Sequence, residues 1–307
     1  GNIGRKGVGV NPLRGQNNVQ GAADMGCQPH QGAGYFPVAD EKHQEFYTEK
    51  YGVTHPTKPG LKIPQMFEAA INKELKGLWI IGEDIVQTDP NSAHVIEAMN
   101  SLELLVVQEI FMSETAKLAT VVLPGTTFLE KDGTFTNTER RIQRVNRAVP
   151  PLPGTKPDGL IVTEMMQKLG FDQPTYDADQ VLAEIADIVP FFKGVTRERL
   201  GKFGLQWPVQ EDGTDTKILH TETFKLGKGR LKNFDWKESS EIEANQKDYP
   251  LILTTSRVLQ HYNAATMTRR TKNINIVDED VLLIHPKDAA HRDLNTGDIG
   301  RLYSGRG

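Results

Sequence analysis

Cysteine is almost missing from this chain, since Cys27 is the single cysteine among 307 residues. One thiol cannot form an internal disulfide. An iron–sulfur cluster or a cysteine-only zinc site requires about four thiolates, which this sequence cannot supply. A basic excess is missing too: 36 Lys and Arg face 40 Asp and Glu, which gives a net charge of −4. This balance argues against nucleic acid as the main partner. No run approaches the ~20 consecutive apolar residues of a membrane-spanning helix.

The common catalytic signatures are also missing. The chain has no GxGxxG after a strand, no GxxxxGK[ST], no HExxH and no GxSxG. Its eight histidines are scattered, and none are spaced as metal ligands, so no metal ligand is predicted within this sequence. Cys27 lies in a polar loop with no activating partner, which is more typical of an inert thiol than of a nucleophile.

What is present is an alternation of apolar runs and helical patterns. The length predicts about two domains at roughly 150 residues each. Pro64, the Asp89-Pro90 pair and Ser113 are helix-start signals. Buried strands are predicted at 78–82, 102–107 and 119–123. This βαβαβ pattern predicts an α/β fold, with a parallel sheet covered by helices on both faces.

Small or polar residues follow each of the three predicted strands. They are Gly82-Glu83-Asp84, Gln108-Glu109 and Pro124-Gly125-Thr126. Open parallel sheets bind ligands beyond the carboxyl ends of their strands, and these loops suit a nucleotide. Polar strand ends are ordinary in α/β proteins as well, so the residues alone leave both interpretations open.

The remaining chain divides into a long loop, further helices and a β-rich end. Residues 1–36 are predicted to be loop, and Asp158 and Asp177 are predicted to begin helices as N-caps. Residues 190–248 are mixed and polar. Strand-like runs at 251–255, 281–284 and 299–303 predict a separate β domain from about residue 247, too short to close a barrel.

The residues at both termini indicate that this chain is a piece of a longer polypeptide. The chain begins with GNIGRKG, without an initiating Met or the apolar region of a signal peptide, and it stops just after a strand-like run. The alternative is an ordinary domain with frayed ends.

One long motif carries a resemblance. The segment GVNPLRGQNNVQGAADMG, residues 9–26, resembles a loop in the catalytic α subunits of molybdenum- or tungsten-dependent formate dehydrogenases, within the molybdopterin oxidoreductase family. The similarity continues through other segments, namely 81–84, 107–111, 123–127, EKDGTFTNTERRIQR at 130–144, 206–208 and 255–271. It covers essentially all of the chain.

The resemblance implies a subunit built around two molybdopterin guanine dinucleotides that hold Mo or W. Residues 1–16 would end one α/β domain, 17–246 would form most of the molybdopterin guanine dinucleotide-binding domain, and 247–307 would begin a C-terminal β-barrel. The family's metal-ligating cysteine or selenocysteine and its four-cysteine 4Fe-4S motif precede the arginine loop and are not in this sequence. We therefore expect these 307 residues to be inactive alone.

The resemblance also implies a set of functional residues. Arg14 matches the family's active-site arginine, and its guanidinium suits formate because it can bind both carboxylate oxygens and orient the C–H bond. A loop arginine that caps backbone carbonyls is the alternative. Asp158 would accept hydrogen bonds from a guanine. The predicted cofactor-binding residues are Gln16, Asn17 and Asn18 at the pterin, Gly82, Glu83, Asp84, Thr88, Gln108 and Asp158 at one guanosine diphosphate arm, and Arg257, Val258, His261, Tyr262 and Thr268 in a loop that closes over the pterins.

The predicted function is therefore part of a formate dehydrogenase that oxidises formate to CO2, or performs the reverse. The predicted partners are formate or CO2, the rest of the same polypeptide and an iron–sulfur electron-transfer subunit, with no nucleic acid and no transmembrane segment. Another molybdopterin oxidoreductase, or a homologue of the complex I large subunit, is an alternative that Arg14 argues against. A non-catalytic nucleotide-binding scaffold is an alternative of another class. The expected compartment is the cytoplasm, with the periplasm as the alternative.

Overall fold

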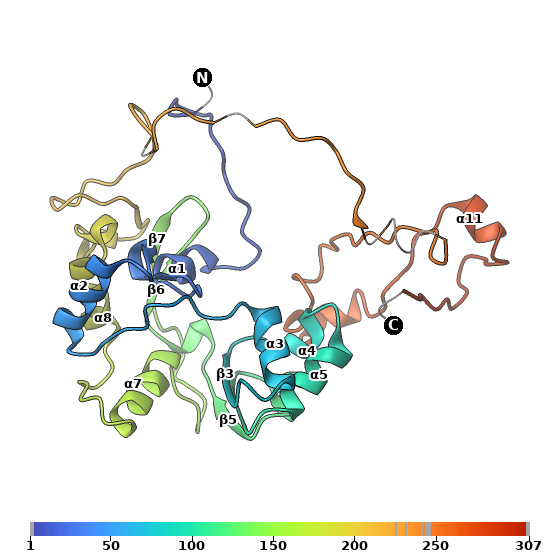
Figure 1. The fold of residues 1–307 in the computed structure, drawn as a ribbon, viewed down its shortest axis with the longest axis horizontal. Coiled ribbons are helices and arrows are strands. Elements are labelled where there is room, and N and C mark those ends of the chain that lie inside the picture. The colour runs from blue at the N-terminus through green and yellow to red at the C-terminus, as the bar shows by residue number, and fades with distance from the viewer. Residues whose placement is uncertain (1–2, 225, 231, 241, 243–246, 305–307) are drawn as a thin grey trace. The chain divides into compact units, whose positions relative to one another are not determined.

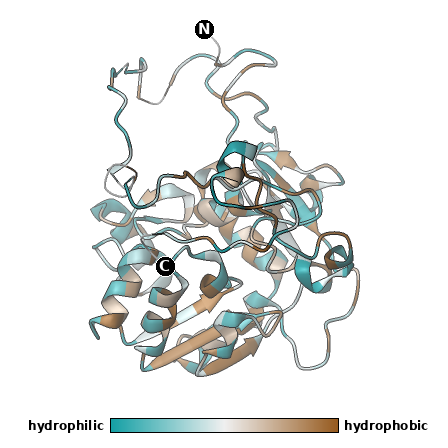
Figure 2. Ribbon diagram, turned by 90° about the vertical axis from the view of Figure 1, so that its right-hand side faces the viewer, coloured by the Kyte–Doolittle hydropathy of each residue, from teal (hydrophilic) through white to brown (hydrophobic). Residues whose placement is uncertain are grey.

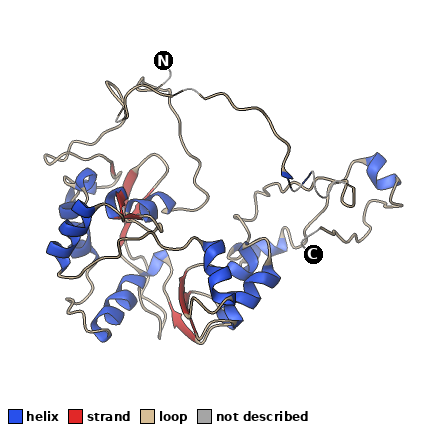
Figure 3. Cartoon of the chain, viewed as in Figure 1, coloured by secondary structure: helices blue, strands red, loops and turns tan. Residues whose placement is uncertain are grey.

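The structure is a computed structural model that describes residues 3–224, 226–230, 232–240, 242 and 247–304. The chain divides into two compact units, Gly1–Gly227 and Lys228–Gly307. Figure 3 shows that the first unit combines helices and strands, and that loops dominate the second. The predicted domain boundary near residue 247 stays a prediction.

A parallel three-stranded sheet organises one part of the first unit (Figure 1). Its order is β3 (Gly77–Ile81), β4 (Leu104–Glu109) and β5 (Val121–Pro124). Ile80 lies opposite Val107, which lies opposite Val122. The sequence prediction of an α/β fold with a parallel sheet is confirmed, with strand bounds shifted by one or two residues.

Helices pack on one face of this sheet. They are α3 (Ile63–Ile71), α4 (Ile85–Thr88), α5 (Ser92–Asn100) and α6 (Glu114–Lys117). Phe67 of α3 and Val95 of α5 pack with Leu105 and Val107 in a buried apolar cluster. Figure 2 shows hydrophobic residues along the strands. On the other face, Ile81 is 49% exposed, so the described residues cover the two faces unequally.

The helix-start signals differ in accuracy. Ser113 and Asp177 are N-caps as predicted, because their side chains accept hydrogen bonds from Ala116 N and from Asp179 N and Gln180 N. The prediction at Asp89-Pro90 is wrong by two residues: α5 begins at Ser92, and the cap is Asn91, whose side chain accepts from His94 N. Asn91 caps the helix instead of Asp89 because it directly precedes the first helical residue and its side-chain oxygen can accept the capping hydrogen bond.

A second, antiparallel sheet forms the other part of the first unit. It consists of β6 (Gly133–Thr136), β7 (Arg141–Val145) and β8 (Leu205–Gln206). Ile142, Leu182, Val189 and Leu200 are buried in its apolar cluster. The other elements of the first unit are α1 (Val19–Asp24), β1 (Gln31–Gly32), η1 (Ala33–Tyr35), β2 (Phe36–Pro37), α2 (Glu41–Tyr51), η2 (Phe128–Glu130), α7 (Asp158–Lys168), α8 (Ala178–Ile188), η3 (Pro190–Phe192) and α9 (Arg197–Leu200).

Two of these helices lie side by side although they are far apart in sequence. Figure 1 shows α2 next to α8, and Tyr51 donates a hydrogen bond to Glu184 over 2.7 Å. Lys50 pairs with Asp187 in the same place. The prediction that residues 1–36 are all loop is wrong for α1 and the small β1–β2 hairpin, because tertiary contacts order a segment whose own composition is that of a loop.

The second unit contains η4 (Thr268–Arg270), η5 (Lys272–Asn275) and α11 (Pro286–Ala290). Its described residues form no strand, so the strand predictions at 251–255, 281–284 and 299–303 are wrong for this structure. The apolar side chains are exposed instead, with Leu283 at 88% and Ile299 at 100%. A strand requires a neighbour to pair its backbone groups, and these segments have apolar residues but no paired neighbour among the described residues.

Candidate functional site

The loop that carries Arg14 is attached to the fold through Asn18. Residues 10–17 have no helix or strand, and Asn18 adopts a left-handed conformation (φ 60°) as the N-cap of α1. Its Oδ1 accepts a hydrogen bond from Thr136 N of β6 over 3.0 Å. A Cβ on Gly21 would lie 2.1 Å from this Oδ1, so any other residue there would displace the Asn18 side chain. Asn18, predicted to line the pterin, therefore has a structural role in joining the loop to the second sheet.

The Arg14 side chain meets a buried polar cluster. Arg14 Nη2 donates to Gln20 Oε1 over 3.1 Å, and Gln20 Nε2 donates to Asp24 Oδ1 over 2.9 Å. Asp24 is completely buried. Its carboxylate also accepts from the Tyr35 hydroxyl over 2.7 Å and from Trp207 Nε1 over 2.9 Å. We name Gln20, Asp24, Tyr35 and Trp207 the Asp24 cluster.

Burial dominates the electrostatics of this cluster. Removal from water raises the pKa of Asp24 above its ordinary value, although the hydrogen bonds from Tyr35, Gln20 and Trp207 and the charge of Arg14 act in the opposite direction. Burial and the neighbouring carboxylate also raise the pKa of the Tyr35 hydroxyl. Sequence reasoning missed this cluster. The available signal was an amide and a carboxylate four residues apart, Gln20 and Asp24, which face the same side of a helix.

Trp207 connects the cluster to two more segments. Its ring lies 4.7 Å from that of Phe191 between centroids, and the Arg140 guanidinium lies 5.4 Å from its centroid. The Arg140 guanidinium also donates to the backbone oxygens of Trp207, Thr216 and Lys217. The resembling segments at 9–26, 130–144 and 206–208 therefore lie together in space around Asp24.

The other predicted loop residues, Gln16 and Asn17, are exposed beside Arg14. Their amides are accessible for a ligand with donors and acceptors. Their predicted contact with the pterin stays a prediction.

At the carboxyl ends of the parallel strands, the structure gathers the second group of predicted residues. Gly82 follows β3 with a φ of 65°, a conformation that favours glycine. Glu83 and Thr88 are exposed, and Thr88 Oγ1 donates to Glu83 Oε1 over 2.6 Å. Asp84 is buried and accepts from Thr115 N over 3.0 Å and Thr115 Oγ1 over 2.7 Å. Asp84 thus fixes the loop after β3 to the start of α6.

Gln108 and Asp158 are joined directly. Gln108 Nε2 donates to Asp158 Oδ1 over 2.7 Å, and Lys131 Nζ pairs with Asp158 Oδ2. The prediction that a helix begins at Asp158 is confirmed, since α7 starts at this residue, but its N-cap is Pro157 and not Asp158. The Asp158 carboxylate is thus turned to Gln108 and Lys131 rather than to its own helix. Lys131, which sequence reasoning did not single out, lies in the resembling segment 130–144.

Buried oxygens without a donor test whether this edge fits a guanine nucleotide. Asp84 Oδ2 and Gln108 Oε1 are buried acceptors, and Thr126 Oγ1 is a buried hydroxyl; none of them has a hydrogen-bond partner among the described residues. Buried polar atoms are nearly always satisfied, so orphaned acceptors indicate a missing donor. A guanine has N1–H and N2–H₂ donors. The residues present therefore fit the guanosine end of the cofactor that the resemblance implies.

Glu109, at the end of β4, belongs to the same edge. Burial raises its pKa, with the charges of Asp84 and Glu83 adding to the effect, while hydrogen bonds from Ile110 N and Phe111 N lower it. Three carboxylates next to one another favour the N–H and O–H donors of a nucleoside over the anionic phosphates of a nucleotide as their immediate neighbour.

In the second unit, the structure brings His261 and Thr268 together. His261 Nε2 lies 2.6 Å from Val277 O, so it donates there, and Nδ1 can accept from Thr268 Oγ1 over 3.0 Å. Tyr262 N also donates to Thr268 Oγ1 over 3.2 Å. His261 is buried and holds its loop together, whereas Arg257, Val258 and Tyr262 are exposed. Their predicted contact with the pterins stays a prediction.

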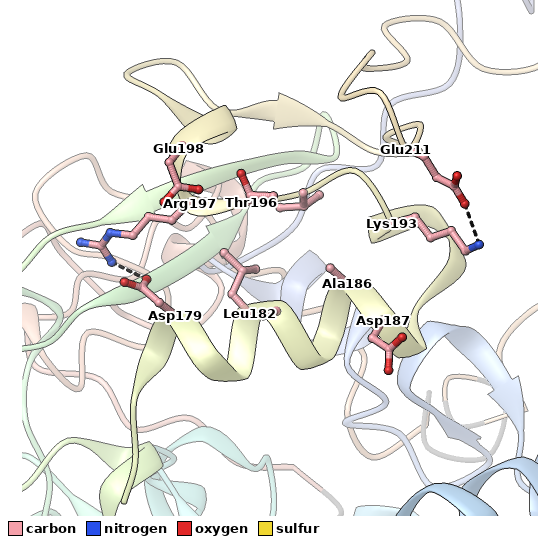
Figure 4. A pocket seen from close by; sticks show the side chains of 11 residues that line it. Asp179, Leu182, Ala186, Asp187, Lys193, Thr196, Arg197, Glu198 and Glu211 are labelled. Carbon is pink, nitrogen blue, oxygen red and sulfur yellow. Dashed lines mark hydrogen bonds and ion pairs between the residues drawn. The ribbon is translucent and has the colours of Figure 1, made fainter. Parts of the chain in front are cut away.

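A groove lined by described residues lies elsewhere. It measures about 580 Å³ and lies between α8 and the segment of α9. Figure 4 shows Arg197 turned to Asp179 and Lys193 turned to Glu211, over 2.5 Å and 2.9 Å. Its cations are thus paired with carboxylates of the same groove, and none of the predicted site residues lines it.

Within residues 3–304, outside the gaps named above, no three or more His, Cys, Asp and Glu side chains gather as a metal site. In the same part of the chain, no helix combines the length and the apolar character needed to span a membrane.

Two segments of the chain match known protein families. Residues 1–168 match the family described as "Molybdopterin oxidoreductase", and residues 251–307 match the "Molydopterin dinucleotide binding domain". Among solved structures, the acetylene hydratase from Pelobacter acetylenicus has a TM-score of 0.56 and 20% identity, covering 83% of this chain and 38% of its own. This likeness concerns the fold. The chain belongs to the molybdopterin oxidoreductase family.

Relatives in that family give the more particular comparison. The chain is 43% identical to the F420-dependent formate dehydrogenase subunit alpha of Methanocaldococcus jannaschii, over 100% of this chain and 46% of the relative. It is 40% identical to a putative formate dehydrogenase of Staphylococcus haemolyticus, over 100% of this chain and 31% of the relative. The chain therefore spans less than half the length of these relatives.

Proposed function

We propose that this chain is part of the catalytic subunit of a formate dehydrogenase, which oxidises formate to CO2 or performs the reverse. The observation that carries the proposal is Arg14, whose guanidinium is held on a defined partner, Gln20, in a loop otherwise exposed. The similarity to proteins named formate dehydrogenase supports it. The fold by itself does not select the reaction, because a related fold occurs in a protein named a hydratase.

Arg14 would bind and orient the substrate. A guanidinium has several N–H donors in one plane. The hydrogen bond from Nη2 to Gln20 leaves further N–H donors for both oxygens of a formate. Fixing both oxygens determines the direction of the C–H bond, and such orientation lowers the barrier of the reaction. A lysine keeps the charge but not the planar pair of donors.

The cofactor in this proposal is a pair of molybdopterin guanine dinucleotides with Mo or W. When bound, this group supplies the two-electron redox chemistry. Gly82, Glu83, Thr88, Gln108 and Asp158 would hold one guanosine diphosphate arm. Asp84 would act there mainly by fixing the loop.

The remaining residues of the proposed cofactor site lie in two loops. Gln16 and Asn17, with Asn18 at their base, would meet the pterin in the first unit. Arg257, Val258 and Tyr262, on a loop held by His261 and Thr268, are the other proposed pterin contacts. Any 4Fe-4S cluster would belong to the rest of the polypeptide.

The proposed partners follow from the same function. They are formate or CO2, the rest of the polypeptide and an iron–sulfur electron-transfer subunit. The cytoplasmic compartment, with the periplasm as the alternative, stays a prediction that cell fractionation tests.

The test compares arginine variants of the complete subunit, isolated with its cofactor. Arg14→Gln should lower kcat/KM for formate-dependent dye reduction by about 10²-fold or more, and Arg14→Lys by less, because the lysine keeps only the charge. The Mo or W content, measured by mass spectrometry, should be unchanged in both. Arg147→Gln, at an exposed arginine outside the Arg14 loop, is the matched control.

Two results would contradict the proposal. One is a metal-loaded subunit that shows no formate oxidation. The other is an Arg14→Gln variant as active as the unaltered protein. Guanine-nucleotide binding in a complete subunit that contains neither metal would favour the scaffold alternative.

A further inference from the structure

The amide of Gln20 has a fixed orientation. Its Nε2 lies 2.9 Å from Asp24 Oδ1 and 2.8 Å from the Tyr35 hydroxyl oxygen. The Tyr35 hydroxyl donates its own proton to Asp24, so it accepts from Gln20. Both contacts require N–H groups, and they place the two amide hydrogens. Gln20 Oε1 is therefore the atom that points to Arg14.

The carboxylate of Asp24 determines the orientation of the Gln20 amide. It is completely buried, and donors from three separate segments converge on its two oxygens: Gln20 of α1, Tyr35 of η1 and Trp207 after β8. A carboxylate is acceptor-only when ionised, which matches a set of three donors. Because charged acceptors form the stronger hydrogen bonds, Asp24 imposes its orientation on Gln20 rather than the reverse.

We propose that Gln20 and Asp24 are positioning residues for Arg14: the buried carboxylate fixes the Gln20 amide, and the amide oxygen fixes the direction in which the guanidinium faces formate. Neither residue touches the substrate. The role of Arg14 toward formate rests on the proposed function, whereas the link from Asp24 to Arg14 is a property of this chain. Trp207 donates to the second oxygen of the same carboxylate, Oδ2. The resembling segment at 206–208 therefore contributes to the same positioning cluster.

Exchange of donors and acceptors tests this link. Asp24→Asn places an amide beside Gln20, so the Gln20 amide can turn and present N–H groups to the guanidinium. In the double variant Gln20→Glu with Asp24→Asn, the carboxylate and the amide change places. The carboxylate now at position 20 would accept from the amide at position 24 and from the Tyr35 hydroxyl, and it would still offer an oxygen to Arg14. The amide oxygen at position 24 would still accept from Trp207.

Glu130→Gln is the matched control. Glu130 is also a buried carboxylate of the first unit, 6% exposed, and it accepts from Thr127 N and Leu152 N over 2.8 Å and 2.9 Å. The substitution is the same change from carboxylate to amide, but none of these contacts involves Arg14. It reports the cost of losing a buried carboxylate without losing the proposed link.

The experiment uses the complete subunit with its cofactor and measures the modification of Arg14 by 2,3-butanedione, followed by peptide mass spectrometry, with and without formate. Without formate, 2,3-butanedione should modify Arg14 about tenfold faster in Asp24→Asn than in the unaltered protein. In the double variant the rate should return to within about threefold of the unaltered protein, and in Glu130→Gln it should be unchanged. Formate should protect Arg14, and Asp24→Asn should require about 10- to 100-fold more formate, the effect of losing an oriented bond to a charged group. In Asp24→Asn, the KM for formate should rise by a similar factor, and kcat should change by less. The double variant should recover both values.

The outcomes separate the two proposals. If formate does not protect Arg14 in the unaltered subunit, the proposed function fails, while the modification rates without formate still decide the link. If Asp24→Asn leaves the rate at Arg14 unchanged, or the double variant regains thermal stability without regaining the slow rate, the positioning role is overturned. If Glu130→Gln accelerates the modification as much as Asp24→Asn, the effect is a general loss of packing and the proposal also falls.

Discussion

At the scale of single residues, burial determines which side chains matter most for stability. Leu105 of β4 is 2% exposed and packs in the apolar cluster between the parallel sheet and its helices. Its neighbour along the strand, Leu104, is 46% exposed. Two adjacent leucines of one strand thus lie in opposite environments, because side chains alternate between the faces of a sheet.

This contrast gives the first stability prediction. Leu105→Ala should lower the free energy of unfolding by about 2–5 kcal/mol, because it removes buried methyl groups and leaves a cavity. Leu169→Ala, at a leucine that is 68% exposed after α7, should change it by less than about 0.5 kcal/mol. Urea unfolding of both variants measures the difference. Equal losses would show that Leu105 is not part of a packed core.

The buried carboxylate of Asp24 gives a pH prediction. Burial raises its pKa above the ordinary value of 3.8, so the folded chain binds this proton more tightly than the unfolded chain. The stability that Asp24 contributes should therefore increase as the pH falls through its folded pKa, and be complete below 3.8. Asparagine does not titrate.

The measurement is the difference in free energy of unfolding between the unaltered chain and Asp24→Asn, taken from about pH 4 to about pH 8. Groups common to both proteins cancel in this difference. The difference should move in favour of the unaltered chain toward low pH. A difference that is flat, or that moves the opposite way, would contradict the raised pKa.

At the scale of elements, short local signals placed some helix starts well. Asp177 is exposed and accepts from two backbone N–H groups of α8 over 2.9 Å each. Its role is therefore confined to capping. The helix it begins is amphipathic, with Leu182 and Ile188 buried.

Asp177→Ala should lower the free energy of unfolding by about 1 kcal/mol, because the two N–H groups lose their acceptor. Asp177→Asn keeps an acceptor and should cost only a few tenths of that. The urea midpoint should shift in the alanine variant at an unchanged slope. A loss in the asparagine variant as large as in the alanine variant would point to the charge, rather than the cap, as the stabilising feature.

At the scale of the whole molecule, the beginning of the second unit is open to proteolysis. Residues 232–239 have no helix or strand, and Phe234 and Trp236 are 90% and 83% exposed. Phe203 is also 75% exposed, but its turn is held by hydrogen bonds from Gly201 N to Glu198 O and Gly204 N to Leu200 O. Proteases need a segment that opens locally, and exposure alone is not sufficient.

Brief digestion with chymotrypsin should therefore cut first after Phe234 or Trp236, near the start of the second unit. Mass spectrometry of the early fragments identifies the site. Replacing both aromatic residues by serine should remove these fragments. A first cut at Phe203 with the 232–239 segment intact would contradict the expectation.

Prediction from the sequence succeeded where the signal was local. The apolar runs and the spacing of apolar residues predicted the three parallel strands, and capping chemistry predicted Ser113 and Asp177. It failed at 251–255, 281–284 and 299–303, where apolar composition is typical of strands but no partner strand pairs with them in the described residues. It also failed at α1, which is ordered by contacts with Thr136 and Trp207 from far along the chain.

The sequence by itself determined the family resemblance, the residues that could carry chemistry and the α/β pattern, because these depend on residue identity and on spacing along the chain. Only the tertiary structure decided that Asp24 is buried beneath Arg14, that Gln108 and Lys131 converge on Asp158, and that Asp84 ties two loops together. Those facts depend on contacts between segments tens of residues apart. Such contacts are set by the packing of whole elements, and no local pattern encodes them.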